Sequence, residues 1–260
     1  MFIPIFLTIV LAFSTIPNVY AISFNTRSSA DTTIRSDQPD TNLGTSAVMY
    51  VRSGSTVNVG RALVQFDLSS IPPGAIINSA YLTLYYDIWA INNPSGRTYT
   101  AYRVTTNWIE GDSIFGATWN EADHNVAGHA TCVDWTNGGE WTMEDAASQT
   151  VPATPAQFMT WTVTGIVEDW VTNGQPNYGF IIRDPNDGVA GTDATAYFNT
   201  REWVIEGQRP ILEIEYTSAN AVGGFFAPTN KLVILTPYIA LVGLIGAIST
   251  IFAIRRWQRD

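Results

Sequence analysis

Hydrophobic and polar positions alternate most clearly between residues 61 and 86. In residues 61–68, every second side chain is apolar (Ala62, Val64, Phe66 and Leu68), and Leu63, Gln65 and Asp67 take the opposite face. Residues 80–86 repeat the pattern, with Tyr81 and Tyr85 on the second face. A period of two is typical of a strand with one buried side. The Pro-Pro-Gly segment between the runs predicts a turn.

Similar short runs recur along the chain, separated by Gly, Asn, Asp and Pro; they cover residues 47–52, 98–105, 159–164, 178–183, 194–200 and 211–216. This pattern predicts an all-β fold, an antiparallel β-sandwich or jelly roll. Residues 164–172 differ, because their apolar side chains share a helical face, and they predict one short helix covering the end of the sandwich. Residues 120–157 show little periodicity and predict a long loop or insertion.

The two ends of the chain are apolar and predict targeting segments. Residues 1–21 fit a signal peptide cleaved after Ala21, and an uncleaved anchor is the alternative. Residues 231–254 contain an uncharged run of membrane-spanning length, followed by arginines that mark a cytoplasmic tail over residues 255–260. A buried core helix is the alternative for this run. Residues 22–217 would then form one external domain, and residues 218–230 a linker.

The charge balance is acidic. The chain has 13 Lys and Arg against 23 Asp and Glu, a formal net charge of −10. A surface that binds nucleic acid requires the opposite sign, so we expect no nucleic-acid partner. An acidic surface suits a solvated domain or one that binds cations. The single cysteine, Cys132, excludes an internal disulfide.

Several landmarks together resemble the DNRLRE domain, which is also classed as a carbohydrate-binding module and is related to the disaggregatase-associated domains of surface proteins. The landmarks are Asp31-Thr32-Thr33-Ile34, Asn42-Leu43-Gly44, residues 61–84 around FDLSSIPPGA, Tyr102-Arg103-Val104, Trp108-Ile109-Glu110, Thr118-Trp119, Trp170, Asn177-Tyr178-Gly179-Phe180, Thr200-Arg201-Glu202 and Arg209-Pro210-Ile211-Leu212. The six-letter family string is absent, and Thr200-Arg201-Glu202 is its nearest remnant. The C-terminal segment is similar to membrane anchors of archaeal surface proteins. The resemblance implies a β jelly roll that binds polysaccharide, with no catalytic set.

Aromatic side chains are the candidates for sugar binding, because sugar rings stack on aromatic faces while carboxylates and amides bond the hydroxyls. Trp135 and Trp141 bracket a polar, glycine-rich turn, and Tyr81 and Tyr85 share the outer face of their strand. The alternative is that all four pack under loops or in a second layer. We interpret Trp108, Trp119 and Trp170 as core residues, because they lie beside strands or the helix.

The resemblance makes a structural Ca²⁺ plausible, since jelly-roll sugar-binding modules often hold one. Asp31, Asp87 and Glu202 are the candidate ligands, because they come near strand ends and carboxylate oxygens suit hard cations. Residues 184–188 (DPNDG) look like a calcium loop but lack the EF-hand spacing, and a turn explains them better.

Other chemistries have weaker signals. Asp123, His124, His129 and Cys132 offer zinc-binding atoms, in a spacing that fits no strong pattern. Glu121 with Asp123, or Glu110 with Asp112, are imaginable as a glycosidase pair, yet close carboxylates on a loop are usually only solvated. The sequence contains no nucleophile elbow, zinc-protease motif or phosphate loop.

The leading hypothesis is a non-catalytic module, anchored at the cell surface by one C-terminal helix, that binds polysaccharide of the envelope or surroundings. The first alternative is a structural or adhesion protein with no sugar site. The second is an enzyme that degrades matrix polysaccharide.

Overall fold

The computed structural model describes residues 21–124, 134–136 and 138–218. These belong to one compact unit of the chain. The predicted signal peptide before Ala21, the span over residues 231–254 and the cytoplasmic tail therefore lie outside the described residues. Across the described part of the chain, no helix is both long and apolar enough to cross a membrane.

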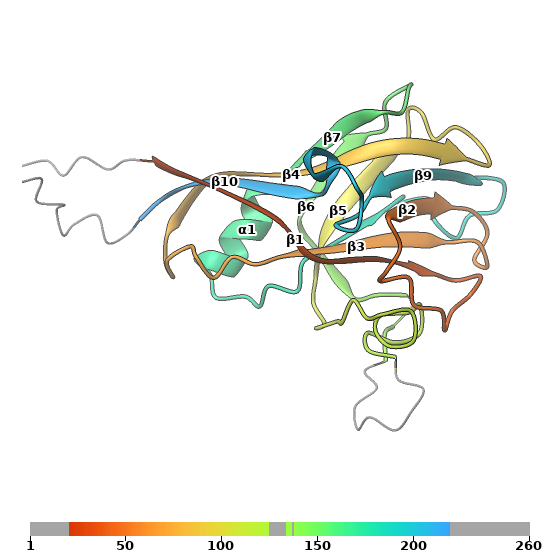
Figure 1. The fold of residues 1–260 in the computed structure, drawn as a ribbon, viewed down its shortest axis with the longest axis horizontal. Coiled ribbons are helices and arrows are strands. Elements are labelled where there is room, and N and C mark those ends of the chain that lie inside the picture. The colour runs from red at the N-terminus through yellow and green to blue at the C-terminus, as the bar shows by residue number, and fades with distance from the viewer. Residues whose placement is uncertain (1–20, 125–133, 137, 219–260) are drawn as a thin grey trace, which may run out of the picture. The chain divides into compact units, whose positions relative to one another are not determined.

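The described residues form ten strands, one α-helix and one short 3-10 turn (Figure 1). In chain order these are β1 (Ala21–Arg35), β2 (Val48–Ser53), β3 (Gly60–Phe66), β4 (Ile76–Ala90), β5 (Thr98–Val104), β6 (Trp141–Thr150), β7 (Gln157–Thr162), α1 (Thr164–Val171), β8 (Phe180–Arg183), β9 (Ala194–Asn199), η1 (Glu206–Gln208) and β10 (Ile211–Thr217). The prediction of an all-β domain with one short helix is confirmed.

All pairings between these strands are antiparallel, and six of the strands close a ring in the order β1-β10-β4-β9-β2-β3. Strands β8, β5 and β6 continue the sheet from β3, and β7 pairs with β4. The sequence predicted a sandwich or jelly roll, and the hydrogen-bonding order instead shows a closed six-strand barrel with extra strands. Closure removes the free edges of those six strands.

Two long strands change partner along their length, and an irregularity lies close to each change; β4 also pairs with β7. Strand β1 pairs with β10 through Ala21–Arg27 and then with β3 from Ser28 onward, with a register shift between Ser28 and Ala30. Strand β4 pairs with β10 and then with β9, with a shift between Tyr86 and Ile88. Bulges bend a strand and redirect its side chains. These two positions therefore set where the barrel turns.

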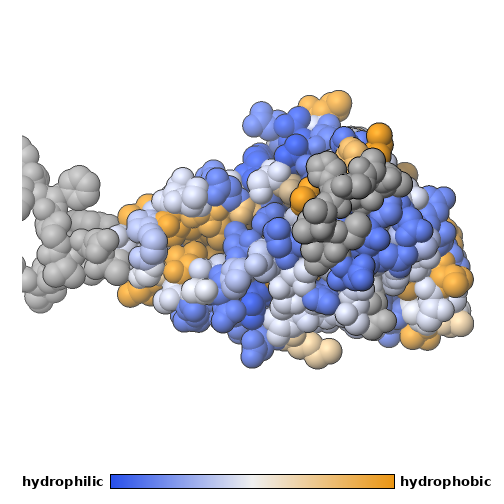
Figure 2. All heavy atoms as spheres, turned by 90° about the horizontal axis from the view of Figure 1, so that it is seen from below, coloured by the Kyte–Doolittle hydropathy of each residue, from blue (hydrophilic) through white to orange (hydrophobic). Residues whose placement is uncertain are grey.

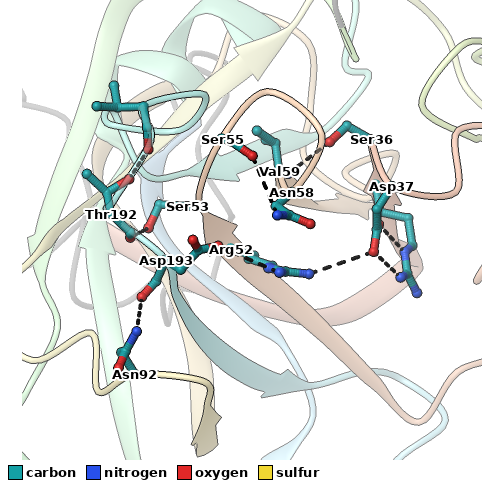
Figure 3. A network of polar contacts seen from close by, with 12 residues as sticks. Ser36, Asp37, Arg52, Ser53, Ser55, Asn58, Val59, Asn92, Thr192 and Asp193 are labelled. Atoms are coloured by element: carbon teal, nitrogen blue, oxygen red, sulfur yellow. Dashed lines mark hydrogen bonds and ion pairs between the residues drawn. The ribbon is translucent and has the colours of Figure 1, made fainter.

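The ring closes weakly between β2 and β3, where Arg52 and Gly60 form the single residue pair. A Cβ at Gly60 would lie 2.4 Å from the Tyr50 ring, so glycine lets that ring cover the junction. Arg52 lies between Asp37 and Asp193, with N–O distances of 3.7 and 3.6 Å (Figure 3). This polar network joins the ends of β1 and β2 to the start of β9.

The buried apolar residues form two clusters that share the wall made by β3 and β8. Ala62, Val64 and Phe66 belong to the larger cluster, and Leu63 belongs to the smaller one on the opposite face of β3. The prediction that β3 buries one side only is therefore wrong, because Leu63 is fully buried. The loops after β5 cover it with Trp108, Ala117 and Ala122.

Helix α1 lies where the sequence placed it and packs against β4 and β6. Its buried face contains Ile166, Val167 and Trp170, and the Thr164 hydroxyl accepts a hydrogen bond of 3.0 Å from the Ala80 amide of β4. Strand β6 corrects the prediction of a long loop or insertion over residues 120–157. It went unrecognised because Ala147 is its one buried residue, which leaves no hydrophobic period.

Candidate functional site

The outer face of β4 combines exposed aromatic rings with polar side chains. Tyr81, Thr83 and Tyr85 point outward, because the alternating residues Leu82 and Leu84 are fully buried. Tyr81 is 40% exposed. We call the surface formed by these three residues and their neighbours on β7 and β10 the β4 face.

Strand β7 extends the β4 face on one side. Phe158 lies opposite Tyr85, with ring centroids 5.1 Å apart in an edge-to-face arrangement, and is 53% exposed. The hydroxyls of Thr83 and Thr160 lie 2.9 Å apart. Across β4 and β7, an aromatic pair (Tyr85 and Phe158) therefore lies next to a pair of hydroxyl groups (Thr83 and Thr160).

Strands β10 and β1 extend the face on the other side. Glu213 lies opposite both Tyr81 and Asn25 in the ladders. A shallow hollow of about 210 Å³ opens here, lined by Ser23, Phe24, Asn25, Ser79, Tyr81, Glu213, Ile214 and Glu215. An aromatic ring beside carboxylates and amides is the side-chain set that recognises a sugar. Tyr81 and Tyr85, predicted from the sequence, thus lie on one accessible surface.

The two tryptophans predicted for the same role lie elsewhere. Trp135 is 7% exposed and packs in the smaller core cluster beside Ile34 and Ile181. Trp141 is partly buried and already in contact with two guanidinium groups, since the Arg61 and Arg183 carbons lie 4.8 and 4.7 Å from its ring centroid. It also lines an open hollow of about 390 Å³ with Thr105, Thr136, Gly139 and Glu140.

The arginines at Trp141 belong to a buried ion cluster centred on Asp187. Arg61 bonds Asp187 at 2.8 Å, and Arg183 bonds the other carboxylate oxygen of Asp187. The Trp119 ring also contacts Arg61, whose guanidinium carbon lies 4.7 Å from the ring centroid. Burial lowers the pKa of Arg61, and its bond to Asp187 opposes that shift. The cation–π contacts and the ion pairs with Asp187 therefore hold these side chains together, so we interpret the cluster as structural rather than as a binding site.

Of the other predicted core residues, Trp108 and Trp170 are buried, whereas Trp119 is partly buried against the smaller cluster. Most of the face that Figure 2 shows is hydrophilic, with a few apolar patches, as expected of a solvated exterior. The zinc hypothesis rests partly on His129 and Cys132, which lie outside the described residues. Within them, His124 Nδ1 contacts Glu121 Oε2 at 2.5 Å.

Two of the three predicted cation ligands come together. One carboxylate oxygen from each of Asp31, Glu110 and Glu202 lies within 4.8 Å of the others, and no further group of three metal-binding side chains occurs among the described residues. We call these three residues the carboxylate cluster. Asp87 is not part of it, because β4 continues to Ala90 and places Asp87 in the bulge after Tyr86.

The sequence reasoning did not place Glu110 beside Asp31 and Glu202 and considered it only as a partner for Asp112. In the structure, Asp112 Oδ1 accepts hydrogen bonds from the amides of Ile114 and Phe115, and so shapes a turn. Glu110 instead accepts a hydrogen bond of 2.7 Å from the Asp31 amide. The position of Glu110 in the Trp108-Ile109-Glu110 landmark was the one available signal.

Residues 23–145 match the model of carbohydrate-binding module family 96. The match begins in β1, ends in β6 and includes Asp31, Tyr81, Tyr85 and Glu110, but not the segment that carries Glu202 and Glu213. No curated protein matches this chain. Among solved structures, a protein of unknown function from Shewanella oneidensis MR-1 is 12% identical over 80% of this chain and 90% of that chain, with a TM-score of 0.21. The comparisons therefore suggest a carbohydrate-binding module as the class of this domain.

Proposed function

We propose that this chain is a non-catalytic module that binds polysaccharide on the β4 face. The match of residues 23–145 to a carbohydrate-binding module family carries the class of function. We place the binding surface on the β4 face because Tyr81 and Phe158 are exposed there beside hydroxyl and carboxylate groups. Anchoring at the cell surface, through a helix over residues 231–254, is part of the proposal and comes from the sequence.

The spacing of the rings supports an extended ligand. Tyr81 and Tyr85 are four residues apart on one strand, which separates their Cα atoms by about 13 Å at the usual rise. A single sugar ring is shorter than that, so the two tyrosines would contact different units of a chain. Beside Tyr81, the Glu213 carboxylate can accept hydrogen bonds from sugar hydroxyl groups, and the Asn25 amide can accept from them or donate to them.

Retention of the full-length protein, purified in a mild detergent, on a panel of acidic and neutral polysaccharides tests the proposal. We expect Tyr81→Ala and Tyr85→Ala each to weaken retention about two- to twelvefold, because an aromatic contact contributes about 0.5–1.5 kcal/mol. Trp89→Ala is the matched control, since Trp89 is 39% exposed on the same strand beyond the bulge. Thermal unfolding confirms that each variant folds.

Each result has a separate meaning. Retention on no polysaccharide would contradict the binding function and favour a structural or adhesion protein. Retention that only Trp89→Ala abolishes would contradict the location. Release of soluble oligosaccharide during the assay would show an enzyme.

A further inference from the structure

The carboxylate cluster draws together three segments that are far apart in the chain. Asp31 lies in β1 just after its bulge, Glu110 in the loop after β5, and Glu202 in the loop after β9. Asp31 is 1% exposed, and the side chains of the two glutamates are 14% and 27% exposed. Three carboxylates so close and so little hydrated repel one another unless a positive charge lies between them.

The buried oxygens of the cluster are incompletely bonded. Asp31 Oδ2 accepts hydrogen bonds from the Ser28 hydroxyl at 2.7 Å and the Arg201 amide at 3.0 Å. In contrast, Asp31 Oδ1 is buried and accepts no hydrogen bond from any described residue, and the same is true of Glu202 Oε2. A buried polar atom without a partner is costly, and such an atom requires an explanation.

Arg201 supplies part of the missing positive charge. Its Nε lies 2.8 Å from Glu202 Oε1 and 3.3 Å from Glu110 Oε1, and its side chain is 41% exposed. One arginine against three carboxylates leaves the cluster with an excess of negative charge. Burial first, and then Glu202 and Glu110, raise the pKa of Asp31 to about 7. Burial also raises the pKa of Glu110.

We propose that Asp31, Glu110 and Glu202 form a binding site for a hard divalent cation, Ca²⁺ in particular. All three donors are oxygens, which such cations prefer over nitrogen or sulfur. Oxygens within 4.8 Å of one another fit around one ion at the usual Ca²⁺–oxygen distance of about 2.4 Å. Mg²⁺ keeps several of its waters and is usually held by one or two carboxylates, so a set of three carboxylates suits Ca²⁺ better.

The bound ion would join β1 to the loops after β5 and β9. Its direct partners would be the unpaired Asp31 Oδ1 and Glu202 Oε2, together with a Glu110 oxygen, and water or backbone carbonyls would complete the shell. Because this site uses no residue of the β4 face, it does not rest on the proposed binding of polysaccharide.

Calorimetric titration of the full-length, metal-free protein with CaCl₂, and separately with MgCl₂, tests the site. We expect one Ca²⁺ per chain, weaker binding of Mg²⁺, and a higher unfolding temperature with Ca²⁺ than with chelator. Glu202→Gln keeps the shape of the side chain and should weaken Ca²⁺ binding at least about tenfold, since it removes a charged ligand. Glu206→Gln, in the exposed η1 turn, should bind Ca²⁺ like the unmodified protein.

The inference fails if the unmodified protein binds no Ca²⁺ at about 10 mM, above the weakest range of extracellular calcium modules. It also fails if Glu202→Gln and Glu206→Gln bind Ca²⁺ equally. If Glu202→Gln does not fold, the unfolding temperature of the unmodified protein with Ca²⁺ and with chelator still decides, and equal temperatures would overturn the site. Polysaccharide retention is scored separately, so either proposal can fail alone.

Discussion

The Asp31 amide donates a hydrogen bond of 2.7 Å to Glu110 Oε1, a contact between residues 79 positions apart. It fixes the loop after β5 against the point where β1 leaves β10 for β3. The sharp turn directly after Glu110 makes this contact possible. Gly111 there has φ of +83°, and a Cβ on it would lie 1.6 Å from the Phe115 carbonyl oxygen.

Replacing Gly111 by alanine should therefore displace Glu110. We expect Gly111→Ala to lower the free energy of unfolding by about 3 kcal/mol or more, from left-handed strain and the clash together. Gly74→Ala is the matched control, because Gly74 has φ of +74° but no atom within 4 Å of the added Cβ. It should cost only about 1–2 kcal/mol. Urea unfolding measures both, and equal losses would contradict the role of the close approach.

The raised pKa of Asp31 predicts that the metal-free protein loses stability with rising pH. The pKa is about 7 in the folded state against 3.8 for the ordinary group, so the folded state binds the proton more tightly. Stability from this group is present below pH 3.8 and is lost as the pH rises to about 7, by about 4 kcal/mol in all. Asp37, whose pKa Arg35 lowers, acts in the opposite sense.

Comparison with Asp31→Asn isolates the contribution of Asp31. The Asp37 effect is present in both proteins and cancels, and the asparagine side chain of the variant does not titrate. We expect Asp31→Asn to be more stable than the unmodified protein at about pH 8 in metal-free buffer, and the difference to shrink or reverse toward about pH 4. Urea unfolding at several pH values measures it. Parallel stability curves for the two proteins would show that Asp31 does not titrate near neutrality.

The buried ion pair between Arg61 and Asp187 should be essential for stability. Their side chains are 7% and 3% exposed, and Asp187 also bonds Arg183. Asp187→Asn removes the negative charge that both arginines contact, and we expect a loss of about 3–5 kcal/mol. Glu144→Gln, at the 75% exposed end of a pair with Arg103, should change stability by less than about 1 kcal/mol. Similar urea midpoints for both variants would refute this assignment.

Local patterns in the sequence predicted the strands whose burial alternates. The outward direction of Tyr81 and Tyr85 follows directly from the buried positions between them. The same alternation predicted that Leu63 faces solvent, which is wrong, because the smaller hydrophobic cluster covers that face of β3. Strand β6 carries no hydrophobic period and forms through its hydrogen bonds to β5.

The carboxylate cluster could be predicted only in part, since long-range closure creates it. Asp31 meets Glu110 across 79 positions and the Arg201 amide across 170, and no local spacing encodes either contact. Asp87 was grouped with them on the expectation that its strand ends there. The strand instead continues through a bulge to Ala90.

The structure predicts that a fragment beginning at Ala30, next to the first landmark at Asp31, is defective. Residues Ala21–Arg27 form a seven-residue ladder with β10, and Ser28 bonds Asp31. A fragment of residues 30–218 would leave β10 as an open edge, which favours association between chains. A fragment of residues 21–218 keeps the closed ring.

Size-exclusion chromatography and thermal unfolding of the two fragments check this prediction. We expect residues 21–218 to elute as a discrete species with a cooperative transition. Residues 30–218 should aggregate or unfold at a lower temperature, because the ladder and the Ser28 bond are lost together. Equal unfolding temperatures would mean that the β1–β10 ladder contributes little. In that case, the barrel would owe its stability to the β3 and β4 pairings and to the core that they enclose.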